Sequence, residues 1–224
     1  MRIYAVADVH GKSTRIERIR KTISEFKPDV LVVAGDITNI RNSEAVIKQL
    51  DSMVIPVLAI RGNTDLPRVD GLLNHYPNTV CLHLKEYIIN GIQFAGVGGT
   101  IPLPFRSQLA LCENRVLKKF ENLVNENTVL VVHPPPWGIL DEAFHRFHAG
   151  SKGLYRFIHR YQPKLVLCGH IHEKSGSETI GKTVVVNCNV TRKNAGAIVE
   201  LEVDEAPIVN ILKAKNGTIR NKCP

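Results

Sequence analysis

The amino-terminal part of the chain alternates short apolar runs with amphipathic segments. Apolar runs occupy residues 3–7, 30–34 and 55–60, and the segments between them carry apolar residues at helical spacing. The run at residues 30–34 contains no polar residue, which is typical of a parallel strand covered on both faces. The order strand, helix, strand, helix, strand predicts an α/β fold with a parallel sheet.

The rest of the chain predicts a second sheet and further helices. Two short runs around Asn90 and Gly91 have the pattern of a β-hairpin, and strands are expected at residues 128–132 and 164–168. Helices are expected at residues 108–125 and 151–161, with short β runs after residue 177. Residues 137–150 form a long irregular segment, which is expected to be functional. Because there are no repeats and no linker, residues 1–224 are expected to form one domain of two packed sheets with helices outside.

Residues of metal-binding type follow the predicted strands. They are Asp8, His10, Asp36, Asn63, His133, His170 and His172. Side chains two apart on a strand project the same way, so Asp8 and His10 are expected side by side, and so are His170 and His172. The carboxyl ends of parallel strands meet at one sheet edge, where all of these residues should converge. The glycine that precedes three of them predicts a sharp backbone turn.

Each of these residues taken alone is ordinarily a turn residue or a satisfied surface histidine. The combination is different, because seven such residues stand at five successive strand ends. Carboxylates and imidazoles held together in this way are the usual ligands of divalent metal ions. The sequence therefore favours a metal site.

The composition is that of an ordinary soluble protein, with 44% hydrophobic and 22% charged residues among 224. No apolar run approaches the length of a membrane span, and the chain is expected to begin with a core strand rather than a signal peptide. The five cysteines are scattered without paired spacing, which indicates reduced thiols. A cytoplasmic location is therefore expected.

The net charge of +8 fits either a solvated surface or the attraction of an anionic substrate. Because the basic residues form no stripe interleaved with aromatic residues, a dedicated nucleic-acid module is not expected. A nucleotide-like substrate and a homo-oligomer are both left open by the sequence.

The motifs, taken in order, resemble those of the calcineurin-like metallophosphoesterases. The matching motifs are Asp8-x-His10, Gly35-Asp36, Gly62-Asn63-x-Asp65, His133 and Gly169-His170-x-His172. The resemblance spans residues 3–172 and implies the metallo-dependent phosphatase fold, a four-layer α/β/β/α sandwich of two mixed sheets.

The resemblance also implies two divalent metal ions. One would be bound by Asp8, His10, Asp36 and His172, and the other by Asp36, Asn63, His133 and His170, with Asp36 bridging. Mixed nitrogen and oxygen ligands favour Mn, Fe, Ni, Co or Zn over Mg or Ca.

The activity implied by the resemblance is metal-dependent hydrolysis of a phosphate ester by a metal-bridging hydroxide. A phosphodiester is the preferred substrate class over a phosphomonoester. Asp65 is expected to support the ligands from behind and is one of two catalytic candidates, and Asn39 is a further supporting candidate.

The chain departs from the commonest form of the family at Thr64, where a histidine usually contacts the phosphate and assists the leaving group. His148 is the first candidate for a replacement acid and His145 is the second, while exposed histidines without a role are an equal alternative. Thr64 also favours a rival hypothesis, a non-catalytic interaction protein on the same fold, like the retromer subunit that resembles these enzymes. The complete set of ligand positions favours the enzyme.

Overall fold

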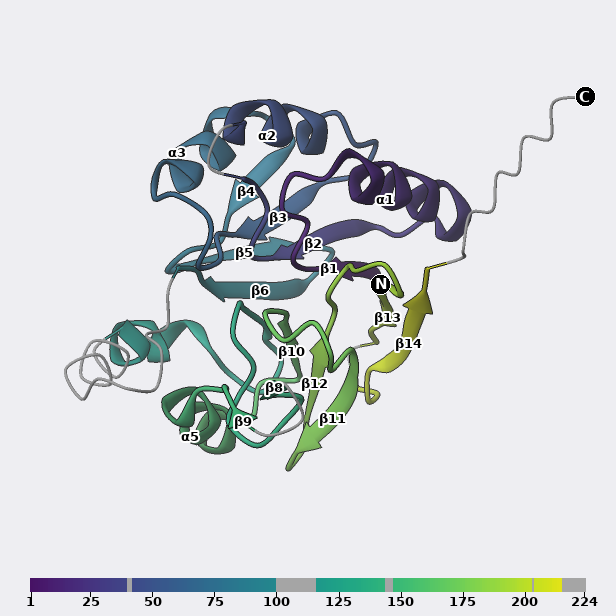
Figure 1. Cartoon of the computed structure of the whole chain (residues 1–224). Coiled ribbons are helices and arrows are strands. Elements are labelled where there is room, and N and C mark those ends of the chain that lie inside the picture. The colour runs from purple at the N-terminus through teal and green to yellow at the C-terminus, as the bar shows by residue number, and fades with distance from the viewer. Residues whose placement is uncertain (40–41, 100–115, 144–146, 203, 215–224) are drawn as a thin grey trace, which may run out of the picture.

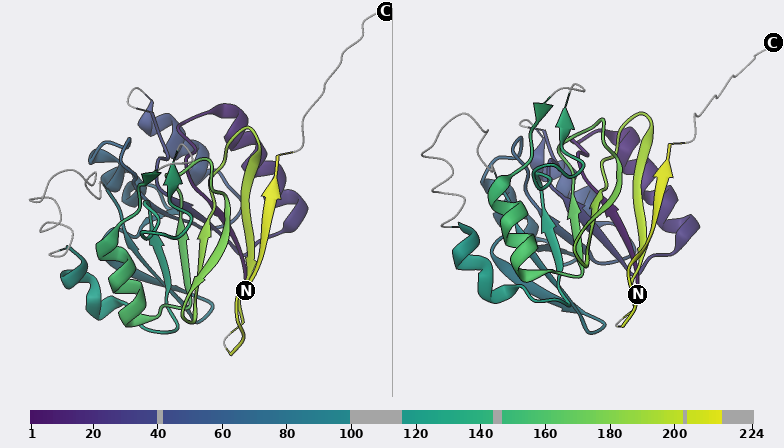
Figure 2. Two further views of the ribbon diagram at one scale, coloured as in Figure 1. Left: turned by 60° about the horizontal axis from the view of Figure 1, so that its bottom comes forward. Right: turned by 90° about the horizontal axis from the view of Figure 1, so that it is seen from below.

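The computed structural model describes residues 1–39, 42–99, 116–143, 147–202 and 204–214. Two six-stranded sheets pack face to face, and helices cover their outer faces (Figure 1). Two further views show the helices on the outside of the paired sheets (Figure 2). The α/β/β/α sandwich of two mixed sheets that the sequence predicts is therefore confirmed.

In the first sheet five strands run in the same direction and one runs in the opposite direction. In spatial order its strands are β14 (Ile208–Lys213), β13 (Asn194–Glu200), β1 (Arg2–Val6), β2 (Val30–Ala34), β3 (Val57–Ile60) and β4 (Thr79–Cys81). Strands β1 to β4 run parallel, while β13 is antiparallel to both β1 and β14. The helices α1 (Ser13–Phe26), α2 (Ser43–Asp51) and α3 (Arg68–His75) pack on its outer face.

The second sheet has a parallel centre and antiparallel edges. In spatial order its strands are β11 (Gly176–Ile180), β12 (Thr183–Asn187), β10 (Leu165–Cys168), β7 (Val129–Val132), β6 (Ile92–Val97) and β5 (Lys85–Ile89). The helix α5 (Lys152–Tyr161) packs on its outer face, together with residues 116–120, which are helical, and the 3-10 turn η1 (Glu121–Leu123). The short strands β8 (Glu142–Ala143) and β9 (Phe147–His148) form a separate two-stranded sheet.

The alternation of side chains along the buried strands creates the layers. On β1, Ile3 and Ala5 face the second sheet, while Tyr4 and Val6 pack against the helices of the first. All four side chains are fully buried. A shift of one residue in register would exchange the two faces, so packing on both sides fixes the register of this strand. The position of the polar residues after Val6 is fixed with it.

The structure differs from the sequence expectation in three segments. Helix α3 was not expected, because Asp70 and Gly71 interrupt its apolar pattern, yet Val69 and Leu73 bury one face. The expected helix at residues 108–125 lies partly outside the described residues, and its described part ends as the turn η1. The segment expected to be irregular at residues 137–150 contains β8 and β9.

The described cysteines agree with the expected reduced state. Cys81, Cys168 and Cys188 are buried and unpaired, while the other two cysteines lie outside the described residues. Within the described ranges, no helix is long and apolar enough to cross a membrane.

Substitution of Phe94 tests how much the core between the two sheets contributes to the stability of the fold. Phe94 lies on β6, is fully buried and packs in the cluster that joins the two sheets. We expect Phe94→Ala to lower the free energy of unfolding by about 3–5 kcal/mol, because a large buried side chain is lost and a cavity is left. The control is Ile88→Ala on the neighbouring strand β5, where the side chain is 63% exposed and the expected loss is about 0.5 kcal/mol. Urea denaturation measures both, and equal losses would contradict this account of the core.

Candidate metal centre

The seven residues predicted as ligands lie in one continuous cluster at the carboxyl ends of β1, β2, β3, β7 and β10. One half is formed around Asp8, whose Oδ1 lies 3.3 Å from Nε2 of His172. The ligand atoms of Asp8, His10 and His172 all lie within 4.8 Å of one another. His10 then leads to Asp36, because its Nε2 lies 3.8 Å from Oδ2 of Asp36.

The other half is formed around His133 and Asn63. Nε2 of His133 lies 3.5 Å from Oδ1 of Asp36 and 2.9 Å from Oδ1 of Asn63. Nδ1 of His170 approaches the same Asn63 oxygen at 3.0 Å. The two oxygens of Asp36 thus face different halves of the cluster, Oδ2 towards His10 and Oδ1 towards His133. This is the arrangement expected of a bridging carboxylate.

The hydrogen bonds of His133 show that the donor set fits a metal ion. Nδ1 lies 2.9 Å from the carbonyl oxygen of Ala34, so Nδ1 carries the proton and donates. Nε2 is therefore the nitrogen directed at the oxygens of Asn63 and Asp36. A proton on Nε2 pairs with these oxygens, and a cation that displaced this proton would meet the mixed imidazole and oxygen donors that suit divalent transition metals.

Electrostatics keep the carboxylate of Asp36 ionised. Burial raises the pKa of Asp36, but the hydrogen bond and charge of His133 and the N–H of Thr64 outweigh burial and hold it well below its usual value. For His133 itself, burial lowers the pKa, while the hydrogen bond to Asp36 and the charge of Asp8 raise it above the usual value overall. These two side chains therefore attract each other strongly across the cluster.

The remaining histidines differ in their affinity for protons. Burial is the main cause that lowers the pKa of His10 and of His170. The hydrogen bond to Asp8 is the main cause that raises the pKa of His172. His10 and His170 are thus biased towards the neutral form, which is the form that binds metal.

Four of the seven residues have left-handed backbone conformations. Asp8, His10, Asp36 and His170 have φ angles of 61°, 52°, 50° and 69°. Residues other than glycine seldom adopt this conformation, and those that do are found most often at functional sites. Asp8 and His10 lie close together, as the sequence predicts. They are not placed by strand geometry, however, because β1 ends at Val6 and both residues lie beyond it. Tight turns bring them together instead.

Glycine is required for different reasons at the three positions that precede Asp36, Asn63 and His170. Only Gly35, before Asp36, has a positive φ, at 92°. At Gly62 the constraint is space, because a Cβ there would lie 2.2 Å from Oδ1 of Asp36. Gly169 is similarly crowded, with Ala7 2.3 Å from the position of a Cβ. The expected sharp turn is therefore found at Gly35, whereas Gly62 and Gly169 permit close approach of two chain segments.

Asp65 ties together two of the loops that carry ligands. Its buried carboxylate accepts the N–H of Ile37 at 2.9 Å, the N–H of Thr38 at 2.8 Å and the N–H of Gly62 at 2.8 Å. The hydroxyl of Thr38 donates to it as well, at 2.7 Å. The expected supporting role agrees with these contacts, since Asp65 faces the backbone behind Asp36 and Asn63. A direct catalytic contact of Asp65 stays a prediction.

Three supporting residues were not found by sequence analysis. Buried Arg15 on α1 donates from Nη1 to the carbonyl oxygen of Asp8, the residue with the strained backbone. Asn187 donates to the carbonyl oxygens of Gly169 and Ile171 at 3.3 and 2.9 Å, and Asn189 donates to Ile171 at 3.2 Å. Both asparagines are fully buried and hold the segment that carries His170. Asparagine is rare inside strands, so its repetition after residue 186 was the available signal.

The other predicted residues lie around the cluster. Asn39 accepts the N–H of Asn42 at 3.0 Å and so orders the chain after Asp36. Thr64 is exposed and its Oγ1 lies 3.5 Å from Nδ1 of His10, which places it beside the cluster. His148 lies on β9, and the hydrogen bond of its Nδ1 goes to Asp141, which is not one of the seven residues. His145 lies outside the described residues.

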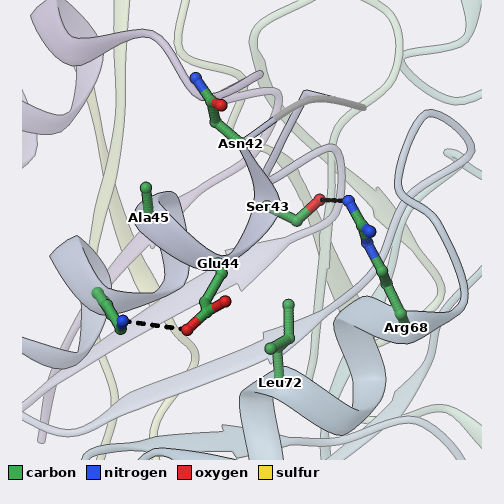
Figure 3. A pocket seen from close by; sticks show the side chains of 7 residues that line it. Asn42, Ser43, Glu44, Ala45, Arg68 and Leu72 are labelled. Atoms are coloured by element: carbon green, nitrogen blue, oxygen red, sulfur yellow. Dashed lines mark hydrogen bonds and ion pairs between the residues drawn. The ribbon is translucent and has the colours of Figure 1, made fainter.

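A separate pocket of about 570 Å³ lies between the beginnings of α2 and α3. Arg68 and Leu72 are among the residues that line it, and Arg68 donates to Oγ of Ser43 at 3.4 Å (Figure 3). None of the seven cluster residues lines this pocket.

The family of the chain follows from direct comparison. The family described as calcineurin-like phosphoesterase matches residues 1–174, so the chain belongs to this family. Its members are phosphoesterases that usually bind divalent metals, and the cluster above contains two groups of suitable ligand atoms. A phosphate ester is therefore the expected kind of substrate.

Proteins of known sequence or structure are similar to this chain over most of its length. The chain is 33% identical to the uncharacterized protein MJ1162 of Methanocaldococcus jannaschii over 198 residues, which cover 84% of this chain and 87% of that protein. The crystal structure of TT1561 of Thermus thermophilus is similar, with a TM-score of 0.71, 18% identity and coverage of 94% and 98% of the two chains. An archaeal phosphodiesterase is similar with a TM-score of 0.56, 14% identity and coverage of 95% and 100%. At these identities the two structures show a shared fold alone.

Gly62 provides a test of the crowded contact beneath Asp36. We expect Gly62→Ala to lower the free energy of unfolding by about 1–3 kcal/mol and to weaken Mn²⁺ binding, because the new Cβ would displace the Asp36 carboxylate. The matched control is Gly71→Ala on α3, where nothing lies within 4 Å of a Cβ and a gain of about 0.5–1 kcal/mol is expected. Denaturant unfolding and calorimetric Mn²⁺ titration measure these effects. Unchanged Mn²⁺ affinity in Gly62→Ala would contradict the role given to this contact.

Proposed function

We propose that the protein is a dinuclear metal-dependent phosphodiesterase. The observation that carries the proposal is the position of Asp36, whose Oδ2 faces His10 and whose Oδ1 faces His133. A single carboxylate between two groups of donors is what a pair of divalent ions requires. The archaeal phosphodiesterase with the same fold is consistent with this proposal but does not carry it.

The ligands are proposed as the sequence motifs assign them. Asp8, His10, Asp36 and His172 would hold one ion, and Asp36, Asn63, His133 and His170 the other. When bound, such ions act as Lewis acids on phosphoryl oxygens and lower the pKa of water. The neutral donors Asn63 and His133 add no negative charge, so the occupied cluster keeps a positive field for an anionic ester. Mn, Fe, Ni, Co and Zn all suit this donor set.

Thr64 favours a diester over a monoester. The family resemblance places a phosphate-contacting histidine at this position, whereas a threonine hydroxyl brings no charge. A phosphomonoester carries close to two negative charges at neutral pH, and a phosphodiester carries one. The smaller positive charge around the phosphate therefore suits a diester.

Three further expectations belong to the same proposal. We propose one domain, because β13 and β14 complete the first sheet beside β1. We propose a cytoplasmic location, because the described cysteines are buried, unpaired thiols. A manganese enzyme is a reasonable starting point for assays, since Mn²⁺ accepts both nitrogen and oxygen ligands.

Substitution of Asp36 tests the dinuclear site directly. After loading with Mn²⁺ and dialysis, we expect two ions per chain in the wild type and depleted occupancy of both in Asp36→Asn, because an amide offers a single neutral oxygen and cannot bridge two ions as a carboxylate does. His172→Gln should chiefly empty one. Hydrolysis of bis-p-nitrophenyl phosphate should fall by roughly 100-fold or more in Asp36→Asn.

The matched control is Asp204→Asn, which changes an exposed carboxylate outside the cluster. It should retain both ions and full activity. Two tightly bound ions with full activity in Asp36→Asn would show that the assignment is wrong. A wild-type protein that binds no ion and cleaves no ester would instead fit the non-catalytic interaction protein.

A further inference from the structure

The segment between His133 and α5 contains a second pair of interacting side chains, Asp141 and His148. Asp141 is 2% exposed, and its Oδ1 lies 2.8 Å from Nδ1 of His148. Its Oδ2 accepts the N–H of Gly150 at 3.0 Å, and its carbonyl oxygen accepts the N–H of Ala149 at 2.9 Å. The carboxylate is therefore fixed on both sides, and it fixes the orientation of the imidazole in turn.

This arrangement exposes one defined nitrogen of His148. An ionised carboxylate only accepts hydrogen bonds, so Nδ1 carries a proton and donates it to Asp141. Nε2 has no hydrogen-bond partner among the described residues, and the side chain is 53% exposed. The ring of Trp137 lies 5.4 Å away between centroids and packs against the imidazole. An oriented imidazole with an accessible Nε2 is suited to proton transfer.

The chain around His148 is attached to both halves of the metal centre. On one side, the segment begins at His133 and continues through three prolines, and the carbonyl of Pro135 accepts the N–H of Ser151 at 2.9 Å. On the other side, Glu142 on β8 forms an ion pair of 2.6 Å with Lys174, two residues after His172. The β8–β9 pair stands beyond the carboxyl ends of the parallel strands of the second sheet (Figure 2). The β8–β9 pair, which carries His148, therefore lies beyond the sheet edge at which the cluster lies.

We propose that His148 protonates the leaving group of the phosphodiester and that Asp141 is its positioning residue. This inference rests on the proposed function. Water contributes its hydroxyl to phosphorus, the bond from phosphorus to the ester oxygen breaks, and its electron pair stays on that oxygen. The proton moves from Nε2 of protonated His148 to the same oxygen. The attacking water releases its proton to solvent, from which His148 is protonated again, so that no other reactant is needed.

The proposal accounts for the residue at position 64. The hydroxyl of Thr64 is far too weak an acid at neutral pH to protonate an alkoxide as it leaves. An acid placed elsewhere restores this contribution, which is typically worth roughly 100- to 10,000-fold in rate. The donor would then approach from the β8–β9 side instead of from the loop after Asn63.

The experiment measures the dependence of rate on the leaving group. The Mn²⁺-loaded protein is assayed with methyl phosphodiesters whose leaving groups run from p-nitrophenol through phenol to a simple alcohol. We expect a shallow dependence in the wild type. In His148→Gln, rates should stay within about 3-fold for p-nitrophenol and fall by roughly 100-fold or more for the alcohol, because only the poor leaving group needs the proton.

Asp141→Asn and His159→Gln complete the series. Asp141→Asn should show the same selective loss to a smaller degree, because the imidazole remains but is less well oriented. His159→Gln removes an exposed histidine of α5 and should leave the dependence unchanged. Equal losses for all leaving groups in His148→Gln would overturn the proposal by showing a role in binding alone. A dependence that is the same in wild type and His148→Gln would overturn it as well.

Two readouts besides activity complete the test. The metal content of His148→Gln and Asp141→Asn should equal that of the wild type, since neither residue belongs to the cluster. Nitrogen NMR of the His148 ring should show a protonated Nδ1 in the wild type and a shifted tautomer balance in Asp141→Asn. An unprotonated Nδ1 in the wild type would overturn the positioning role of Asp141.

A different result would show that the proposed function itself is wrong. If the wild-type protein had no phosphodiesterase activity at all, the proposed function would fail, and the inference that rests on it would fail too.

Discussion

Two buried carboxylates that lie close together are the constraint on which the centre of this structure depends. The ligand atoms of Asp8, Asp36 and His133 lie within 4.8 Å of one another, and both carboxylates are almost fully buried. Like charges in a buried site repel, and each also loses its hydration. The surrounding imidazoles offset part of this cost, and divalent ions would offset more. Binding of a divalent ion would therefore stabilise this region.

The loops that carry the ligands are held by buried polar groups rather than by regular strand pairing. Asp65 binds the loops after β2 and β3, and Asn187 with Asn189 binds the loop after β10. Arg15 reaches the carbonyl of Asp8 from α1. A left-handed residue costs on the order of 1–3 kcal/mol and persists where its surroundings determine it. The polar contacts are what determine these conformations, and they keep the ligand atoms in place before an ion binds.

The loops around the cluster contribute different kinds of side chain. The loop after β3 contributes Asn63 to the cluster but only a hydroxyl at Thr64. The segment after β7 contributes His133 and then, across the β8–β9 pair, the histidine that Asp141 orients. A family fold can retain its metal ligands and vary the groups around them, because the ligands come from strand ends and the other groups come from loops.

The fold and the residues that meet in the cluster were largely predictable from the sequence, because both depend on local patterns. Continuous apolar runs identified β2 and β7, and the polar residues directly after each run identified the cluster. Helix α3 was missed because Gly71 weakens its pattern, although tertiary burial of Leu73 stabilises it.

What only the tertiary structure decided is how the cluster is supported. Arg15 and Asp8 interact across a turn, Asn187 reaches the loop of His170, and Asp141 meets His148 through a reversal of the chain. Their spacing has no fixed period, so no pattern in the sequence identifies these pairs. The sequence by itself determined which side chains stand at the strand ends. The folded chain determined their backbone conformations and partners, because these depend on contacts between segments far apart in sequence.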